Sequence, residues 1–391
     1  MRKMKNILTL NAISPVINDV FDTSYNVASD AEQPVGIMLR SFKMHGYPLS
    51  EQTLAVARAG AGVNNIPVEE YAEKGVVVFN TPGANANAVK ELVISALLLG
   101  SRKIVDSVKW VETLKGKGEE ISKLVEKGKS QFVGGEISGK SLGVIGLGAI
   151  GAQVANAAIG LGMDVFGYDP FLSVNAALKL SRHVNVVKEL DEIIKNCDYI
   201  TIHIPYIASQ NKGFINAGVI RKMKDGAVII NCARGELVEN ADVIKAAESG
   251  KIARYFTDFP ADELIGVKNV ICTPHIGAST PEAEENCAVM AAKELIDFIE
   301  NGNIVNSVNY PACSMPRTTA YRLLILHKNV TNILAQITGT VGSEGINIAN
   351  LSNQSKGNYA VTMIDTDADV PDRALKHISA LEGIIRVRII K

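Results

Sequence analysis

The chain has 391 residues, of which 47% are hydrophobic and 21% charged, a composition typical of a folded protein of two or three domains. Its 40 basic and 41 acidic side chains give a formal net charge of −1, which argues against nonspecific binding to nucleic acid. The longest uncharged apolar run, residues 92–100, is too short to span a bilayer, and the N-terminus lacks the features of a signal peptide. The five cysteines form no CxxC pair, so we expect no metal site, no disulfide framework and a cytoplasmic location.

The first 90 residues alternate strand-length apolar runs with helical patterns. Residues 35–39 and 76–79 predict strands. Residues 50–57 and 67–74 predict helices, the first opened by a serine of the kind that caps helices. This alternation predicts an α/β fold for the first stretch.

The alternation becomes regular between residues 92 and 300. Apolar runs predict strands at residues 141–145, 163–168, 199–203, 227–231 and 270–272. Helical patterns lie between them, at residues 149–160, 190–196 and 240–249. Strand–helix repetition of this kind builds a doubly wound parallel sheet. A long helical pattern over residues 280–300 can lead back to the first stretch, and the Lys/Glu/Gly-rich residues 115–135 predict an exposed excursion.

The last stretch of the chain has a different pattern. Residues 306–318 contain two prolines and several small polar residues, which is typical of a linker. The following residues predict the order βαββαβ, with strands at 319–326, 346–351, 359–365 and 384–390 and helices at 331–341 and 371–381. This order is that of a small ferredoxin-like domain.

A glycine-rich turn follows the predicted strand at residues 141–145 and opens the next helix. The glycines have the spacing GxGxxG, at Gly146, Gly148 and Gly151. In that context the first glycine makes a tight turn, the second lets the backbone approach a pyrophosphate, and the third lets the helix pack closely on the strand. Asp169 ends the next predicted strand, where a carboxylate accepts hydrogen bonds from the ribose hydroxyls and repels a 2′-phosphate. The turn therefore predicts binding of NAD rather than NADP.

Polar residues also stand at the ends of later predicted strands, where open α/β sheets bind ligands. They include Arg234, Asp258 with Glu263, and His275. An arginine can hold a substrate carboxylate through two hydrogen bonds, and a histidine can exchange a proton with an oxygen at C2. A carboxylate beside that histidine favours the imidazolium form. The set suits hydride exchange at a 2-hydroxy or 2-keto acid.

Several segments resemble the signatures of the D-isomer-specific 2-hydroxyacid dehydrogenases. They are GVIGLGAIG, YDP, NCARGELV and TPHIGAST, with IMLRS, ARAGAGVNNI and NTPGAN in the first stretch. The C-terminal βαββαβ pattern resembles an ACT domain, an amino-acid-sensing module. The resemblance implies two Rossmann-like domains with doubly wound parallel sheets, followed by the ferredoxin-like ACT domain. That combination is typical of family members that use NAD to oxidise 3-phospho-D-glycerate to 3-phosphohydroxypyruvate, the first step of L-serine biosynthesis.

The resemblance also implies domain boundaries. Residues 1–91 would form a substrate-binding domain that is completed by about residues 284–310, and residues 92–283 an NAD-binding domain. Residues 311–318 would be a linker, and residues 319–391 the ACT regulatory domain. Family members of this kind form homodimers or homotetramers, so we expect a homo-oligomer.

Carried over residue by residue, the resemblance implies roles for individual side chains. The expected catalytic residues are Arg234, which would hold the substrate carboxylate, His275 as the acid/base, and Glu263 as its partner. The expected NAD-binding residues are Gly146, Gly148, Ala149, Ile150, Gly151, Asp169, Pro205, Cys232, Ala233, Arg234, Asp258, His275, Gly277 and Ala278. The expected substrate-binding residues are Arg40, Ser41, Ala61, Gly62, Asn85 and Arg234.

Two parts of this interpretation have alternatives. Arg40 is the expected phosphate-binding residue, but Phe42 stands where relatives often have a second basic residue, so Lys109 or Lys115 could serve instead. The substrate could then be glyoxylate, hydroxypyruvate or another 2-keto acid. In the last domain His327, Asn329 and Asn347 would bind L-serine as an effector, or the domain would serve only in assembly. A non-enzymatic NAD-sensing scaffold is the alternative from another functional class.

Overall fold

The computed structural model describes residues 4–391, apart from the side chain of Asn175. By its internal contacts the chain divides into two compact units. Unit 1 comprises the described part of Met1–Asn85 together with Glu284–Lys391, and unit 2 comprises Ala86–Ala283. Among residues 4–391, no helix is long and apolar enough to cross a bilayer.

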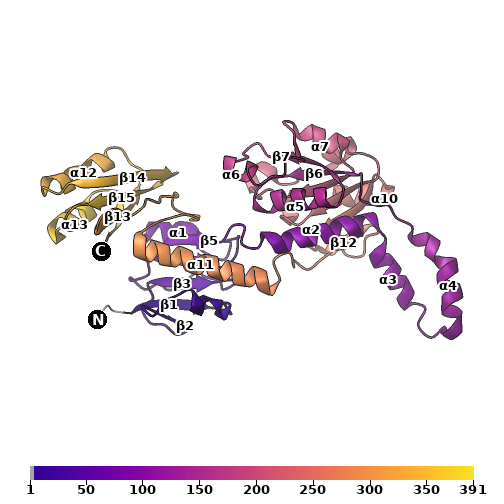
Figure 1. Ribbon diagram of the computed structural model, residues 1–391, viewed down its shortest axis with the longest axis horizontal. Helices are drawn as coiled ribbons and strands as arrows, with labels where there is room; N and C mark the ends of the chain where they lie inside the picture. The colour runs from indigo at the N-terminus through magenta and orange to yellow at the C-terminus, as the bar shows by residue number, and fades with distance from the viewer. Residues whose placement is uncertain (1–3) are drawn as a thin grey trace. The chain divides into compact units, whose positions relative to one another are not determined.

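Unit 2 is built on a seven-stranded sheet in which all strands are parallel (Figure 1). The strands are β6 (Ser141–Ile145), β7 (Asp164–Tyr168), β8 (Asn185–Val186), β9 (Tyr199–Ile202), β10 (Ala227–Asn231), β11 (Ile252–Thr257) and β12 (Val270–Cys272). Their order is β12-β11-β10-β9-β6-β7-β8. The order reverses between β6 and β9, and such a switch point is where a doubly wound sheet binds its ligand.

Helices cover both faces of this sheet. One face packs against α2 (Ala86–Ser101) and α5 (Ala149–Gly160), and the other against α7 (Leu190–Asn196), α9 (Ala217–Lys222) and α10 (Asn240–Ser249). The central strands β9 and β10 are buried on both sides, which explains why they read as unbroken apolar runs rather than alternating ones. Two single-turn helices, α6 (Val174–Ala177) and α8 (Ala208–Asn211), lie in the connections.

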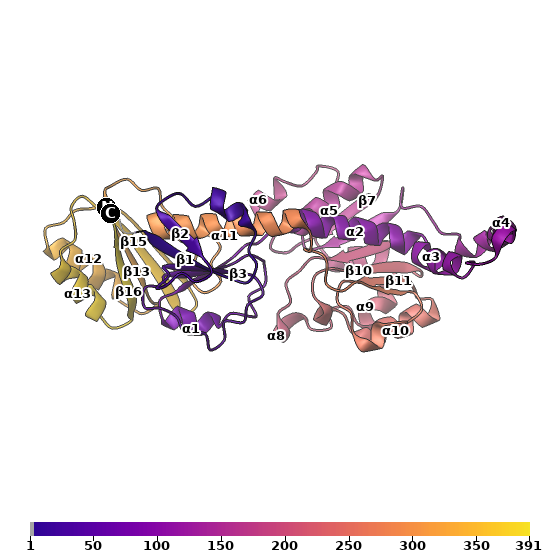
Figure 2. The same cartoon turned by 90° about the horizontal axis from the view of Figure 1, so that it is seen from below.

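The predicted excursion is confirmed. Residues 104–132 form α3 (Ile104–Glu112), α4 (Ile121–Gly128) and the short 3₁₀ segments η2 (Gly118–Glu120) and η3 (Lys129–Phe132), and none of these elements has a buried residue. Figures 1 and 2 show α3 and α4 extending from the seven-stranded sheet.

Unit 1 contains a five-stranded parallel sheet of order β2-β1-β3-β4-β5. The strands are β1 (Lys5–Leu10), β2 (Tyr25–Ala28), β3 (Gly36–Leu39), β4 (Ala55–Arg58) and β5 (Val77–Asn80). Its helical elements are η1 (Pro15–Asp19), α1 (Val68–Glu73) and the long α11 (Pro281–Asn301). The α11 side chains Leu295 and Phe298 belong to the core on one face of the sheet.

The prediction of a helix at residues 50–57 is wrong. Ser50 instead opens a turn, in which the Thr53 amide donates to the Ser50 carbonyl at 3.0 Å. The chain then enters β4, which pairs with both β3 and β5 and is central to the sheet. Residues 55–57 are fully buried there. The pairing partners available on both sides outweigh the helix propensity of the two alanines in this segment.

The C-terminal residues form a separate four-stranded antiparallel sheet of order β14-β15-β13-β16. Its elements follow the predicted order βαββαβ: β13 (Tyr321–Lys328), α12 (Ile333–Ser343), β14 (Ile348–Lys356), β15 (Tyr359–Thr366), α13 (Asp372–Ala380) and β16 (Ile384–Ile390). Alternate strand residues such as Leu323 and Ile325 pack against α12 and α13.

The other face of this small sheet is part of the core of unit 1. Leu324, Leu326 and Val361 belong to the same hydrophobic cluster as Phe79 and Phe298. Figure 2 shows the strands of the small sheet with α12 and α13 on their left and β1 and β3 on their right. Within unit 1 the small sheet is therefore packed on both faces, as the centre of a three-layer arrangement.

Buried polar groups strengthen this junction. The fully buried Arg322 makes two hydrogen bonds to Asp365, at 2.6 and 2.9 Å, and also donates to the Asn301 carbonyl at the end of α11. Within the segment predicted as a linker, Tyr310 is buried and donates to the Ala72 carbonyl at 2.7 Å. Residues 309–311 and Cys313 are thus buried within unit 1, while the predicted domain boundaries stay a prediction.

Candidate active site

The glycine-rich turn between β6 and α5 has the geometry expected of a pyrophosphate site. Gly146 has φ +91°, and a Cβ there would lie 2.6 Å from the His203 carbonyl oxygen. A Cβ at Gly151 would lie 1.9 Å from the Gly146 carbonyl oxygen, so only glycine lets α5 approach β6 this closely. At Gly148 a Cβ would meet no protein atom within 4 Å, so the space beside it is open to a ligand. Gly146 and Gly151 are therefore required by the backbone geometry, whereas the space beside Gly148 is available to a ligand.

Asp169 lies at the carboxyl end of β7, beside this turn. Its carboxylate accepts hydrogen bonds from the amides of Leu147 and Phe171, both at 2.9 Å. Gly148 caps α5 without a side chain, so the first amides of the helix, including those of Ala149 and Ile150, face outward without a side-chain cap. An anionic ligand and a ribose are the groups that such a helix end and such a carboxylate bind. The turn therefore fits a dinucleotide.

Three further predicted cofactor residues lie at the ends of β9 and β10. Pro205 is exposed, and Cys232 and Ala233 follow β10 with 9% of Cys232 exposed. Burial raises the pKa of the Cys232 thiol, which favours its neutral form. His203 contacts the Thr201 hydroxyl at 2.9 Å, and burial lowers its pKa to about 4, so it is a neutral side chain of the sheet edge.

The turn after β12 carries His275 and is held by the carboxylate of Asp258. Oδ1 of Asp258 accepts hydrogen bonds from Thr273 Oγ1 at 2.6 Å and from the Ile276 amide at 2.8 Å. Oδ2 accepts one from the Gly277 amide at 2.7 Å. Asp258 is 1% exposed, and His275 has φ +57°, a left-handed conformation that non-glycine residues rarely adopt. Asp258 thus fixes the backbone of the turn on both sides of His275.

Glu263 and His275 form no hydrogen bond or ion pair with each other in the structure. Glu263 lies in the 3₁₀ segment η5 (Asp262–Leu264), and its carboxylate accepts a hydrogen bond from Asn240 Nδ2 at 2.9 Å, which lowers its pKa. Among residues 4–391, the His275 imidazole has no hydrogen-bond partner; its ring packs against Phe259, with centroids 4.9 Å apart. Pairing of Glu263 with His275 therefore stays a prediction that requires Glu263 to leave Asn240.

Arg234 follows β10 and is exposed, with Nη1 donating to the Ala233 carbonyl at 2.7 Å. The side chain of Asn231 shapes this turn. Its Nδ2 donates to the Arg234 carbonyl at 2.8 Å, and its Oδ1 accepts from the Ala233 backbone amide at 3.1 Å. Since β10 and β12 both pair with β11, Arg234 and His275 stand at the same edge of one sheet. In the described chain neither the Arg234 guanidinium nor the His275 imidazole forms a hydrogen bond or an ion pair with another side chain.

The predicted substrate-binding residues of unit 1 lie at the carboxyl ends of its parallel strands. Arg40 and the exposed Ser41 follow β3, and Ala61 and Gly62 follow β4. Arg40 is not free, because its guanidinium forms an ion pair with Glu284 at 2.5 Å. Arg58 donates to the carbonyls of Arg40 and Gly62 and so links the two turns. Asn85 is half-buried beyond β5.

The three predicted effector residues differ in exposure. His327 is 1% exposed, and its ring nitrogens contact the Lys328 carbonyl and the Thr362 hydroxyl, both at 2.8 Å. Asn329 is exposed and donates to the Gly357 carbonyl at 3.2 Å, and Asn347 is exposed at the start of the next strand. Effector binding by these residues stays a prediction, and it would require His327 to exchange an existing partner.

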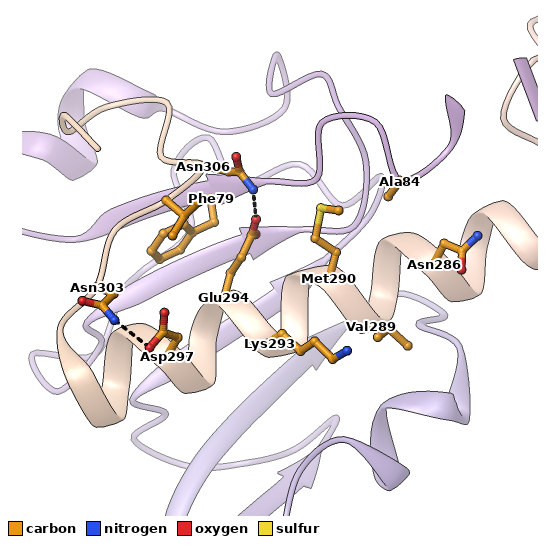
Figure 3. Close-up of a pocket in the computed structure, with 11 residues that line it drawn as sticks. Phe79, Ala84, Asn286, Val289, Met290, Lys293, Glu294, Asp297, Asn303 and Asn306 are labelled. Carbon is orange, nitrogen blue, oxygen red and sulfur yellow. Dashed lines mark hydrogen bonds between the residues drawn. The ribbon is translucent and has the colours of Figure 1, made fainter. Parts of the chain in front are cut away.

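A cavity of about 500 Å³ in unit 1 lies under α11 and contains none of the predicted site residues (Figure 3). Phe79, Met290 and Val305 line its apolar part. Glu294 accepts a hydrogen bond from Asn306 there at 2.5 Å, and burial raises its pKa to about 7. We assign the cavity to the packing of α11 within unit 1, because it is lined by α11 and its neighbours in that unit and by none of the predicted site residues.

Two features of the site were missed by sequence reasoning. The clamp formed by Asp258 could have been suspected, because a carboxylate at a strand end often binds the amides of a neighbouring turn. The contact between Phe259 and His275 had only a weak signal, an aromatic residue next to Asp258 at the end of β11. Such a contact depends on how the ends of β11 and β12 lie side by side.

Comparisons with known proteins agree with this geometry. Residues 94–277 match the family model described as the NAD-binding domain of D-isomer specific 2-hydroxyacid dehydrogenases. The D-3-phosphoglycerate dehydrogenase of Escherichia coli is 32% identical over 356 residues, which cover 87% of this chain and 82% of that protein. The protein of the same name from Methanocaldococcus jannaschii is 34% identical over 297 residues, covering 74% of this chain and 54% of its own.

Solved structures give the same result. An NAD⁺-bound 3-phosphoglycerate dehydrogenase from Entamoeba histolytica is 26% identical with a TM-score of 0.60, covering 78% of this chain and 99% of that one. A D-2-hydroxyisocaproate dehydrogenase has a TM-score of 0.65 over 78% of this chain and 99% of its own, and at 24% identity it supports the fold alone.

Proposed function

Because the chain belongs to the family of NAD-dependent D-isomer-specific 2-hydroxyacid dehydrogenases, we propose that it oxidises 3-phospho-D-glycerate to 3-phosphohydroxypyruvate, the first step of L-serine biosynthesis. The observation that carries the proposal is the similarity to a D-3-phosphoglycerate dehydrogenase over 82% of that protein's length. The sheet edge that holds Arg234 and His275 supplies the groups this reaction needs.

In this proposal the residues of the site have separate tasks. Bound NAD supplies the chemistry of accepting a hydride from C2 of the substrate. Arg234 binds the substrate carboxylate through two hydrogen bonds, which fixes the orientation of C2. His275 takes the proton of the C2 hydroxyl, and a carboxylate such as Glu263 beside it would favour the charged imidazole that results. Backbone amides near Ala61 and Gly62 are the further groups expected to bind the substrate.

The phosphate group of the substrate is the part with the weakest structural support. Arg40 is the expected phosphate-binding residue, and its guanidinium is paired with Glu284. Phosphate would have to displace that carboxylate or bind another basic residue. This observation favours one second candidate, a reductase of glyoxylate, hydroxypyruvate or another unphosphorylated 2-keto acid with the same catalytic residues.

We also propose that the enzyme is a cytoplasmic homo-oligomer and that its C-terminal sheet is an ACT domain that binds L-serine. The βαββαβ order of this domain supports the assignment. Asn329, next to Gly357, and Asn347, next to Asp367, are both exposed but lie at opposite ends of this sheet, so a site that uses both would need the interface between two copies of the domain. His327 is buried and both of its ring nitrogens are hydrogen-bonded, so L-serine would have to displace one of these partners.

A substrate comparison tests the proposed reaction. The full-length chain is assayed for reduction of 3-phosphohydroxypyruvate and of unphosphorylated hydroxypyruvate with NADH. We expect kcat/KM to be at least about 100-fold higher for the phosphorylated substrate, because a bound phosphate contributes several charge-assisted hydrogen bonds. Equal or reversed values of kcat/KM would assign the enzyme to the second candidate function.

A further inference from the structure

Different contacts hold the backbone and the side chain of His275. Hydrogen bonds from the turn to Asp258 fix the backbone, but among residues 4–391 no side chain forms a hydrogen bond to the imidazole. Glu263 is bound to Asn240 instead. A catalytic imidazole must be held in one orientation to exchange a proton with a defined oxygen atom. Its orientation here has to come from packing.

The packing partner is Phe259. Its ring centroid lies 4.9 Å from that of His275, with the ring planes 57° apart, within the range of favourable aromatic pairs. Phe259 follows Asp258 directly in the sequence. The end of β11 therefore supplies both the carboxylate that binds the backbone of the His275 turn and the ring that packs against the imidazole. The Phe259 amide donates to Thr257 Oγ1 at 3.2 Å, which anchors this strand end to β11.

Phe259 also contacts the turn that carries Arg234. A Cβ added to Gly235, the next residue after Arg234, would lie 3.2 Å from Cβ of Phe259 and 3.7 Å from its ring. A side chain at position 235 would therefore crowd Cβ of Phe259 and touch the first atom of its ring at an ordinary contact distance. Phe259 lies between the two turns that carry the proposed catalytic side chains.

We propose that Phe259 is a positioning residue, which packs between His275 and the Arg234–Gly235 turn and holds the imidazole in the orientation needed for proton exchange. This inference rests on the proposed function, because it takes His275 as the acid/base. Phe259 would be an uncharged member of the site, in addition to Arg234, Glu263 and His275. Phe259 acts through His275 and carries no proton itself.

The inference is tested with Phe259→Leu in the full-length protein, assayed with whichever 2-hydroxy acid the wild-type enzyme oxidises. Because only orientation is lost, we expect kcat to fall about 3- to 10-fold with KM unchanged within about twofold. Phe259→Tyr keeps the ring and should retain most of kcat. Phe214→Leu, which shortens another half-buried phenylalanine of unit 2, should change kcat by less than about twofold.

A second measurement does not depend on activity. The His275 ring protons lie near the Phe259 ring, so their NMR resonances carry its ring-current shift; the His275→Asn spectrum identifies them among the six histidines. We expect Phe259→Leu to remove this shift, and Gly235→Ala, which crowds Cβ of Phe259 and so displaces its side chain, to change it and to lower kcat.

Three results would overturn the inference: an unchanged His275 resonance in Phe259→Leu, an equal loss of kcat in Phe214→Leu, or a rise of KM without a fall of kcat. Failure of the wild type to oxidise 3-phosphoglycerate would instead contradict only the proposed substrate.

Discussion

His275 combines an unusual backbone with an exposed side chain, and both follow from its position after β12. The sequence was sufficient to place Arg234 and His275 at strand ends, because apolar runs followed by polar residues mark those ends reliably. It was not sufficient to find the partners of these side chains. Glu263 bonds to Asn240, 23 residues away, and that choice depends on the path of the loop.

At this scale we predict the effect of replacing the acid/base. His275→Asn should lower kcat by about 10²- to 10⁴-fold, the usual contribution of general acid–base catalysis. The affinity for NAD should change by less than about twofold, because Asp258 holds the turn through Thr273, Ile276 and Gly277 rather than through the imidazole. Steady-state kinetics and NAD titration by fluorescence measure the two quantities. An equal loss of NAD affinity would show that His275 acts mainly in cofactor binding.

Among the elements, the turn from β6 to α5 was the most predictable, because glycine spacing, strand and helix all agree there. β4 was the least predictable. Its four residues are alanines, valine and arginine, a composition that is equally compatible with a helix, and only its position between β3 and β5 decides the outcome.

The glycines of the β6–α5 turn give a matched pair of variants. Gly151→Ala places a Cβ 1.9 Å from the Gly146 carbonyl oxygen, so we expect a loss of stability of about 2 kcal/mol or more. Gly148→Ala meets no protein atom within 4 Å, so the melting temperature should stay nearly constant while NAD affinity falls about 10-fold or more. Thermal unfolding and NAD titration of both variants test this division. Unchanged NAD affinity in Gly148→Ala would contradict the assignment of this turn to the pyrophosphate.

On the scale of the whole molecule, the α/β class of the first two stretches and the βαββαβ order of the last were predictable from the alternation of strands and helices, whereas β1, β2, β4, β8 and β11 were not predicted as strands. The place of the C-terminal sheet within unit 1 was not. Its strands alternate in a way that buries one residue set under α12 and α13 and the other against α11 and the first sheet, and both sets are apolar. A pattern of this kind indicates burial on two sides but does not identify the second neighbour.

The buried pair Arg322–Asp365 provides a stability test of this junction. Burial alone would raise the pKa of Asp365, but hydrogen bonds from Arg322 and Thr318 outweigh it and lower the pKa. Arg322→Met leaves the carboxylate buried without its partner and should cost about 3 to 5 kcal/mol of unfolding free energy. The double variant with Asp365→Leu should recover most of that loss, whereas Lys391→Met, which breaks an exposed pair with Asp369, should have little effect. Urea unfolding measures all three, and a small cost for Arg322→Met would contradict a packed junction.

The most direct test of the proposed reaction follows the hydrogen atom at C2. The full-length enzyme is incubated with NAD and 3-phosphoglycerate that carries deuterium at C2, and the reduced cofactor is analysed by mass spectrometry. We predict that deuterium is recovered in NADH at the rate of turnover and that oxidation is slower than with the unlabelled substrate. Reduced cofactor without deuterium, or no turnover of this substrate under conditions where hydroxypyruvate is reduced, would contradict the account.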